Sequence, residues 1–245
     1  MTIEVVEVQR RSSQGSTQPF LCKADDGNLY FVKGRGAGYR SLICEWIAGC
    51  IGAELGLPIP PFEILEVPPQ LLELPNDLGL ADLGTGPVFG SRMIGVTELT
   101  TIHLDTIPEE TQLDVLAFDW WVHNVDRTLT EKGGNPNLFI EPATSNLVVL
   151  DHNLSFDPEF RKQDILRYHA FRNQRDRLLG DMVNRQIYSG KFMSILSGWT
   201  NICEKVPEEW KHFDGKDSIE TNFCFESALN CLNKYEQDSF WTEHD

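Results

Sequence analysis

The spacing of apolar residues divides this chain into a strand-like part and a helix-like part. Before about residue 97, short apolar runs alternate with polar positions and are separated by turn signals, which is typical of antiparallel strands. Further along, apolar residues recur at roughly every third or fourth position, as in amphipathic helices. The pattern predicts an α+β fold of two lobes: a small antiparallel sheet lobe with one helix over residues 1–97, and a larger, mainly helical lobe over residues 98–245.

The sheet lobe is expected to hold a hairpin, a helix and two later strands. The expected strands cover residues 3–8, 18–24, 28–33, 62–67 and 87–96. Asp25-Asp26-Gly27 separates two alternating runs, and an aspartate-glycine turn in that position is a strong hairpin signal. A glycine-rich stretch then ends the strand pattern before a helix over residues 39–55, and Gly56 marks the expected stop of that helix.

The first helix of the helical lobe is expected to begin at Pro108, because proline suits the first position of a helix. Glu109 and Glu110 follow it, and acidic side chains are favoured in a first helical turn. The apolar stripe of this helix ends at Trp121. Two short strands are expected next, at residues 138–140 and 147–150, and the patterns from residue 158 onward are helical.

Composition and charge narrow the function classes. With 41% hydrophobic residues the chain is an ordinary globular one, and no apolar run approaches the roughly 20 residues needed to cross a bilayer. The six cysteines form no C-x-x-C pair, so we expect thiols in a reducing compartment. The net charge of −16 opposes nucleic-acid binding. We therefore expect a cytoplasmic protein without nucleic-acid or membrane partners.

Chemically useful polar residues occur where rigid elements are expected to end. Asp126 follows the helix that ends near residue 121, and Asn137, or its neighbour Asn135, opens the first short strand. Asp151 closes the second short strand. A carboxylate base and two hard oxygen ligands on such loops suit phosphoryl transfer from Mg-ATP. Asp126 is the candidate base, and Asn137 and Asp151 are the candidate metal ligands.

A lysine and a glutamate extend this set into the sheet lobe. Lys33 ends the third expected strand, which is a suitable position for a cation that contacts ATP phosphates. Glu45, on the helix that follows, is its candidate partner. On a helical wheel Glu45 lies opposite the apolar stripe, so a solvated glutamate is the alternative interpretation, with Glu54 as the substitute partner.

Five motifs, taken in order, resemble those of the HipA-like kinase family. They are Tyr30-Phe31-Val32-Lys33, then Glu45 followed by Leu55-Gly56-Leu57-Pro58-Ile59-Pro60, then Asn124-Val125-Asp126-Arg127, Asn135-Pro136-Asn137-Leu138 and Leu150-Asp151-His152. The resemblance extends from about residue 4 to residue 156. It implies a protein-kinase-like fold, and ATP and Mg²⁺ as cofactors.

The resemblance also implies a role for each candidate residue. Asp126 would accept or orient the proton of the substrate hydroxyl, Lys33 would contact the phosphates beside Glu45, and Asn137 and Asp151 would hold Mg²⁺. Residues 12–17 would form the loop over the nucleotide. The nucleotide contacts expected in addition to Lys33 are Ser13, Gly15, Ser16, Met93 and Val96.

The activity implied by the resemblance is phosphorylation of a serine or threonine in a protein substrate. Relatives in bacterial toxin–antitoxin systems modify serines in the corresponding loop. The candidates for autophosphorylation are therefore Ser12, Ser13, Ser16 and Thr17. An antitoxin-type regulator is a candidate partner on the same ground.

Two other function classes stay open. A pseudokinase or nucleotide-binding interaction module would share the fold signals and lack turnover. A metal-dependent phosphohydrolase would use His123, Asp126, Asp151 and His152. Departures from the kinase pattern keep both alternatives open, because the loop from Asp126 to Asn137 is longer than in protein kinases and His152 replaces the phenylalanine that follows the metal aspartate there. The sequence lacks both G-x-x-x-x-G-K-[ST] and G-x-S-x-G, which excludes a P-loop NTPase and the commonest hydrolase.

Overall fold

The computed structural model describes residues 2–13, 17–73, 78–131, 133–212 and 220–244. The chain has a mixed α+β fold and divides into two compact units. Unit 1 comprises Met1–Trp46, Pro60–Ile94 and Val206–Phe223, and unit 2 comprises Ile47–Ile59, Gly95–Lys205 and Cys224–Asp245.

The two units are not the contiguous halves 1–97 and 98–245 of the sequence-based division. One boundary, between Ile94 and Gly95, lies close to the expected one. However, helix α1 (Tyr39–Leu55) begins in unit 1 and ends in unit 2, and residues 206–223 belong to unit 1. Trp210 connects residues 206–223 to the rest of unit 1. Its buried indole donates from Nε1 to the carbonyl oxygen of Pro87.

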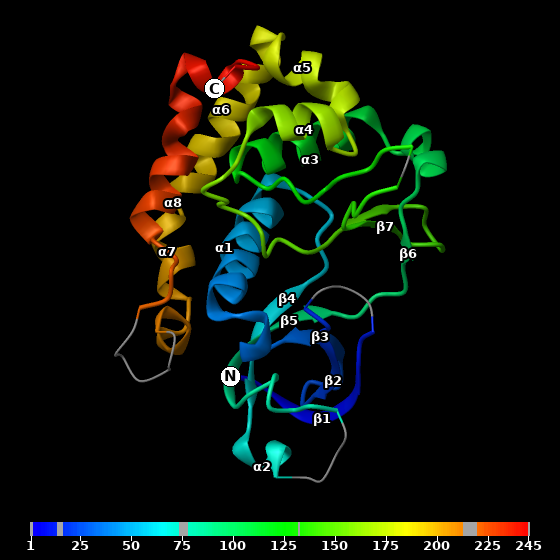
Figure 1. Ribbon diagram of the computed structural model, residues 1–245, viewed down its shortest axis with the longest axis vertical. Coiled ribbons are helices and arrows are strands. Elements are labelled where there is room, and N and C mark those ends of the chain that lie inside the picture. The colour runs from blue at the N-terminus through cyan, green and yellow to red at the C-terminus, as the bar shows by residue number, and fades with distance from the viewer. Residues whose placement is uncertain (1, 14–16, 74–77, 132, 213–219, 245) are drawn as a thin grey trace. The chain divides into compact units, whose positions relative to one another are not determined.

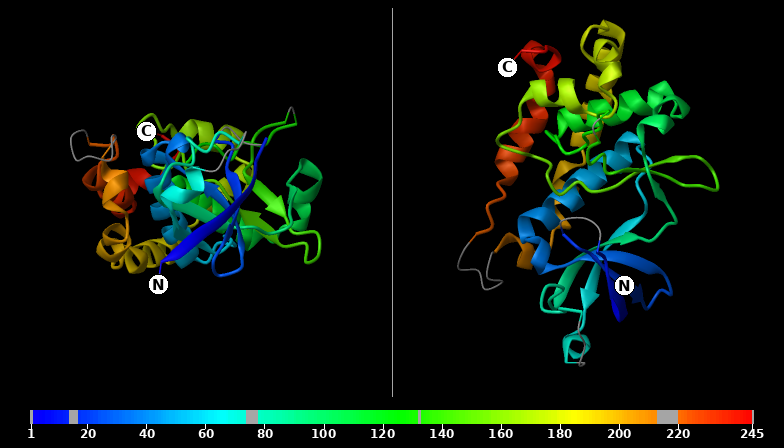
Figure 2. Two further views of the ribbon diagram at one scale, coloured as in Figure 1. Left: turned by 90° about the horizontal axis from the view of Figure 1, so that it is seen from below. Right: turned by 45° about the vertical axis from the view of Figure 1, so that its right-hand side comes forward.

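Unit 1 is built around one closed five-stranded sheet with the strand order β1-β2-β3-β5-β4 (Figures 1 and 2). Its strands are β1 (Ile3–Arg11), β2 (Phe20–Ala24), β3 (Leu29–Lys33), β4 (Phe62–Val67) and β5 (Gly86–Arg92). The expectation of a purely antiparallel sheet is wrong, because β1 pairs with β4 in parallel and so closes the sheet. The expectation of a single helix also needs correction, since the short helix α2 (Pro69–Leu72) lies between β4 and β5.

The interior of the closed sheet is apolar because alternate side chains on each strand point inward. Val5, Cys22, Val32, Leu65 and Val88 are fully or almost fully buried there. The predicted hairpin is present between β2 and β3. Its turn is stabilised by Asp26, whose carboxylate accepts from the backbone and side-chain nitrogens of Asn28 and from the Tyr30 hydroxyl.

The glycine-rich stretch after Lys33 is held against the 79–84 loop. The amide of Arg35 donates to the carbonyl of Leu83, and the amide of Gly36 donates to that of Asp82. A Cβ added at Gly34 would lie 1.9 Å from the Leu83 oxygen, so only glycine fits this close approach. The stretch therefore closes the end of β3 and fixes where Lys33 lies.

Unit 2 is mainly helical and carries one small sheet (Figure 1). Its helices are the second part of α1, then α3 (Glu109–Trp121), α4 (Lys162–Tyr168), α5 (Arg175–Leu179), α6 (Met182–Leu196), α7 (Trp199–Glu204) and α8 (Phe225–Leu232). The sheet has the order β6-β7-β8, from β6 (Thr97–Glu98), β7 (Leu138–Ile140) and β8 (Leu147–Val149). The two short strands expected from the sequence are thus present as β7 and β8.

Aromatic side chains form the core of unit 2. The Trp121 ring of α3 stacks on Phe192 of α6 at a centroid distance of 3.8 Å. The two indole nitrogens of α3 reach C-terminal carbonyls, since Trp120 donates to Phe240 and Trp121 donates to Leu232. Because a buried indole N–H needs an acceptor, these bonds also fix the rotation of α3. That rotation determines where the loop after Trp121 begins.

The expectations about membrane spans, cysteines and helical patterns can be compared with the described residues. No helix in the described part of the chain is long and apolar enough to cross a membrane. All six cysteines are described and none forms a disulfide. The region expected to be helical from residue 158 onward contains α4, α5, α6, α7 and α8, while residues 213–219 lie outside the described residues.

Candidate functional site

In unit 1, Lys33 and Glu45 form a buried ion pair. The Lys33 ammonium lies 2.5 Å from Oε1 of Glu45, and their side chains are only 11% and 2% exposed. The interpretation of Glu45 as a solvated glutamate is therefore wrong, and the substitute Glu54 is exposed. The helical wheel was misleading because residues 42–49 are all buried, so this part of α1 has no solvent face.

In unit 2, the carboxylate of Asp126 is held by two asparagine side chains. Asn137 donates from Nδ2 to Asp126 Oδ2 at 2.7 Å, and Asn135 donates to the same oxygen at 3.3 Å. Asn137 is buried, whereas Asn135 is exposed. Both asparagines that were considered as metal ligands thus donate to Asp126, and Asn137 makes the shorter hydrogen bond.

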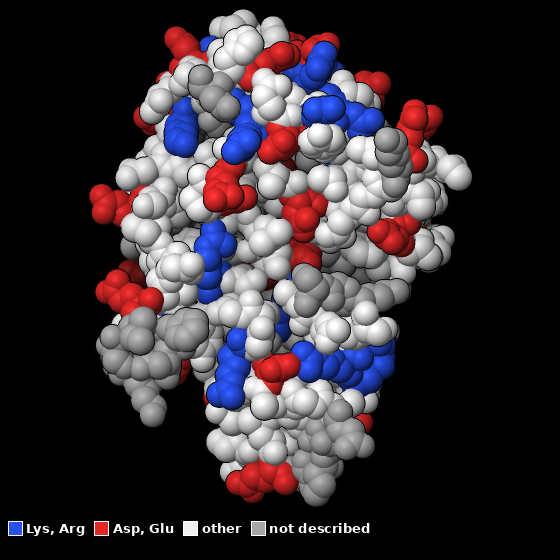
Figure 3. Space-filling view, viewed as in Figure 1, with Lys and Arg blue, Asp and Glu red and all other residues white. Residues whose placement is uncertain are grey.

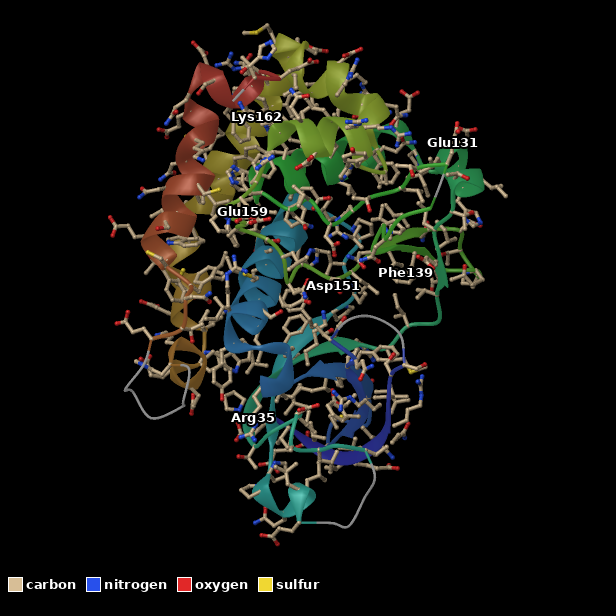
Figure 4. All side chains as sticks on the ribbon, viewed as in Figure 1. Arg35, Glu131, Phe139, Asp151, Glu159 and Lys162 are labelled. Carbon is tan, nitrogen blue, oxygen red and sulfur yellow. The ribbon has the colours of Figure 1, made fainter. Side chains whose placement is uncertain are left out.

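The β7–β8 hairpin brings Asn137 and Asp151 to the same end of the small sheet. Leu138 pairs with Val149 in the register, so Asn137 precedes one strand where Leu150 follows the other. The amide of Leu150 donates to the carbonyl of Asn137 at 3.1 Å, which closes that end. We refer to Asp126, Asn137 and Asp151 as the loop cluster. Asp151, which is labelled in Figure 4, follows directly after this closing bond.

The backbone at the loop cluster adopts an uncommon conformation. Asn137 has a φ of 48° and Asp151 has a φ of 59°. Left-handed backbone is disfavoured for residues other than glycine, and in folded proteins such strain is concentrated at functional sites. The strain supports a functional interpretation of both positions.

The electrostatics of the loop cluster combine burial with like charge. Burial raises the pKa of Asp126, and the nearby Asp151 carboxylate raises it further, while the bonds from Asn137 and Asn135 act in the opposite direction. A raised pKa makes a carboxylate a better proton acceptor. Two carboxylates this close also create a site of negative potential that suits a cation.

The loop cluster has suitable ligand atoms for Mg²⁺. The amide nitrogen of Asn137 must face Asp126, because a carboxylate can only accept, so its oxygen is available to a cation. Mg²⁺ is commonly held by one or two protein oxygens together with phosphates and water. Asn137 and Asp151 could supply such oxygens. Groups of three or more His, Cys, Asp or Glu that would hold a metal are absent from the described residues.

The histidines of the phosphohydrolase alternative are engaged in packing. The His123 ring stacks on Phe160 at a centroid distance of 3.9 Å, and burial, aided by Lys234 and Lys162, lowers its pKa to about 3. His152 is buried, and its ring meets Phe118 edge-on. All four residues of that alternative are described, and they do not form a metal-binding group.

Sequence reasoning missed a buried network beneath the loop cluster. Asp119 of α3 accepts from His169, Asn124 and Arg127. Burial alone would raise the pKa of Asp119, but the Arg127 charge and the bonds from His169 and Asn124 hold it below its usual value. An acidic residue inside an otherwise apolar helix pattern was the available signal.

The other predicted nucleotide contacts are placed as follows. Ser13 is exposed in the segment after β1, while Gly15 and Ser16 lie outside the described residues. Met93 and Val96 belong to the link between β5 and β6, where the chain passes from unit 1 to unit 2. Within the long insertion between Asp126 and Asn137, Glu131 is well separated from Asp151 in Figure 4, whereas Asn135 contacts Asp126.

Two arginines of the α4–α5 region, Arg172 and Arg177, have partners within unit 2. Arg177 contacts Glu109 and Glu110, and Arg172 donates to the carbonyls of Leu129 and His169. Figure 3 shows lysine and arginine beside aspartate and glutamate over this region on the face drawn.

Comparison with known proteins places these observations in a family. The HipA-like kinase family matches residues 5–244. Among curated proteins, none matches the chain. One similar solved structure is that of the Helicobacter pylori proinflammatory kinase CtkA, with a TM-score of 0.50 and 12% sequence identity, covering 98% of this chain and 94% of that one. At this identity the likeness supports the fold alone. The family match spans nearly the whole chain, and the chain therefore belongs to the HipA-like kinase family.

Proposed function

We propose that this kinase uses Mg²⁺ and ATP to phosphorylate a serine or threonine hydroxyl of a protein. The observation that supports it best is the loop cluster, in which the candidate metal ligand Asn137 donates a hydrogen bond to the candidate base Asp126. The buried pair of Lys33 and Glu45 supports it independently, because phosphate binding by a kinase lysine depends on such a glutamate.

Each residue of the proposed site has a defined task. Asp126 holds the acceptor hydroxyl and takes its proton, while the bond from Asn137 keeps the carboxylate oriented. Lys33, held by Glu45, supplies positive charge to the phosphates. Asn137 and Asp151 hold the metal, and bound Mg²⁺ would neutralise charge on the phosphate oxygens.

The proposal also names a phosphate acceptor and a partner protein. Ser12, Ser13, Ser16 and Thr17 are the proposed sites of autophosphorylation, by analogy with toxin–antitoxin relatives. Of these, Ser13 is exposed after β1, as a modified residue must be. A protein substrate and an antitoxin-type regulator remain proposals on the same ground.

The test is transfer from γ-labelled ATP. The protein is incubated with Mg²⁺ and labelled ATP, and label in the protein is counted and mapped by mass spectrometry. We expect incorporation by the wild type and a loss of about 10²-fold or more in Asp126→Asn, because a positioned base contributes that much.

Asp114→Asn is the matched control for this experiment. Asp114 also lies in unit 2, but it accepts from Tyr188 and Lys191, outside the loop cluster. This control should retain transfer. Equal incorporation by the wild type and Asp126→Asn would contradict the proposed role of Asp126 and favour a nucleotide-binding module.

A further inference from the structure

Arg127, the residue after the candidate base, contacts both candidate metal ligands of the loop cluster, Asn137 and Asp151. Its guanidinium is 0% exposed. Nη1 donates to the carbonyl of Asn137 at 3.0 Å and to that of Leu150 at 2.7 Å. Nη2 donates to the carbonyl of Asp151 at 3.4 Å. One side chain therefore holds the backbone before β7, at Asn137, and the backbone after β8, at Leu150 and Asp151.

Every N–H of this guanidinium has an acceptor. Besides the three carbonyls, Nε donates to Asp119 and Nη2 donates to Nδ1 of His152 at 2.9 Å. An arginine has five N–H groups and no acceptor, so Nδ1 of His152 must be unprotonated and the ring proton lies on Nε2. A buried cation satisfied at all five positions is fixed in both place and orientation.

The carbonyls that Arg127 holds belong to strained residues. Asn137 and Asp151 have left-handed backbone, and their peptide oxygens accept from the guanidinium. A left-handed residue other than glycine persists only where its surroundings impose it. The guanidinium imposes this backbone conformation on both residues, because it holds both of their carbonyl oxygens.

Asp119 keeps the guanidinium in place. It balances the buried positive charge, with Nε of Arg127 at 2.8 Å from Oδ2, and is itself fixed by His169 and Asn124. Asp119 belongs to α3, whose rotation is set by its buried indoles. The helix, the guanidinium and the loop cluster thus form one connected support.

We propose that Arg127 is a positioning residue that sets the separation of Asn137 and Asp151 and thereby the affinity of the site for its divalent metal. The inference rests on the proposed function, since it assumes that these two residues hold the metal. Lysine cannot replace arginine here, because an ammonium is a point donor and cannot span three carbonyls and an imidazole in one plane. Loss of such a supporting contact typically weakens metal binding by 10- to 100-fold.

The test compares Mn²⁺ binding by wild type, Arg127→Lys and Arg172→Lys. Mn²⁺ is titrated at a saturating concentration of a non-hydrolysable ATP analogue and followed by EPR, with the binary metal–nucleotide complex measured separately. We expect Arg127→Lys to raise the Kd for Mn²⁺ by about 10- to 100-fold. Its metal-free affinity for the analogue should stay unchanged. Arg172→Lys is the matched control, since Arg172 also donates to two carbonyls, those of Leu129 and His169, outside the loop cluster.

A second variant covers the case in which Arg127→Lys does not fold. Asp119→Asn/Arg127→Met removes both buried charges together, which proteins tolerate better than the loss of one partner. It should fold by circular dichroism and show the same weakened Mn²⁺ binding. Failure of both variants to fold would assign Arg127 to the fold alone and overturn the proposal.

Asp151→Asn separates this inference from the proposed function. If Asp151→Asn loses Mn²⁺ while Arg127→Lys keeps the wild-type Kd, the metal site stands and the role of Arg127 is wrong. If the wild type binds no Mn²⁺ with the analogue, or Asp151→Asn binds it equally well, the proposed metal site itself fails and the inference fails with it.

Discussion

The buried pair of Lys33 and Glu45 gives the sharpest prediction for single residues. Lys33→Met leaves the Glu45 carboxylate buried without its cation, and breaking such a pair costs about 3–5 kcal/mol. The burial of the pair therefore predicts that Lys33→Met has a lower free energy of unfolding in urea. Lys33→Met/Glu45→Gln should recover most of that loss without recovering phosphate transfer. A single variant as stable as the wild type would show that the pair is not effectively buried.

Asp126 should oppose folding at neutral pH. Because burial and Asp151 raise its pKa in the folded state, the native protein takes up this proton first as the pH falls. Its favourable contribution is thus present at low pH and is lost as the pH rises through the raised value. Asp126→Asn should therefore unfold at an equal or higher Tm at pH 7, with the difference from the wild type vanishing below about pH 4. A lower Tm at pH 7 would contradict this.

The candidate site was predictable where its residues lie next to element ends. Asp126, Asn137 and Asp151 all follow or precede short apolar runs, and the hairpin does bring two of them together. The burial of Glu45 was not predictable, because a wheel assumes one solvent face. The role of Arg127 was hidden for another reason. Its acceptors are backbone carbonyls of residues far along the chain, which no pattern of side chains reports.

Among the elements, the turn after β3 and the helix α6 offer two contrasting glycines. Gly34→Ala would place a Cβ against the backbone of Leu83 and should lower the free energy of unfolding by about 1–3 kcal/mol. Gly190→Ala adds a Cβ with nothing within 4 Å inside α6 and should raise it by about 0.5–1 kcal/mol. Urea denaturation of both variants checks this prediction. Equal effects would show that the close approach at Gly34 is not maintained.

The periodicity of the sequence predicted well which helices and strands form, but it did not predict which strands pair. The helix over residues 39–55 and the strand over residues 62–67 match α1 and β4 at both ends. The parallel contact of β1 with β4 was missed, because it joins segments distant in sequence and leaves no local turn signal. The helix α2 was missed because one helical turn has too little periodicity to detect.

For the whole molecule, the two halves of the proposed set of functional residues belong to different units. Lys33 and Glu45 belong to unit 1, whereas the loop cluster belongs to unit 2. Each half is internally supported, by α1 in one case and by Asp119 and Arg127 in the other. The proposal assigns the phosphates to Lys33 and the metal to the loop cluster, so binding of an ATP analogue should weaken in variants of either unit.

Calorimetric titration with a non-hydrolysable ATP analogue tests this central claim most directly. The account predicts one Mg²⁺-dependent site per chain, lost with EDTA, weakened at least about tenfold in Asp151→Asn and weakened in Lys33→Met/Glu45→Gln. Asp114→Asn should bind as the wild type does. Absence of binding by the wild type, or an affinity unchanged by EDTA and by Asp151→Asn, would contradict the account.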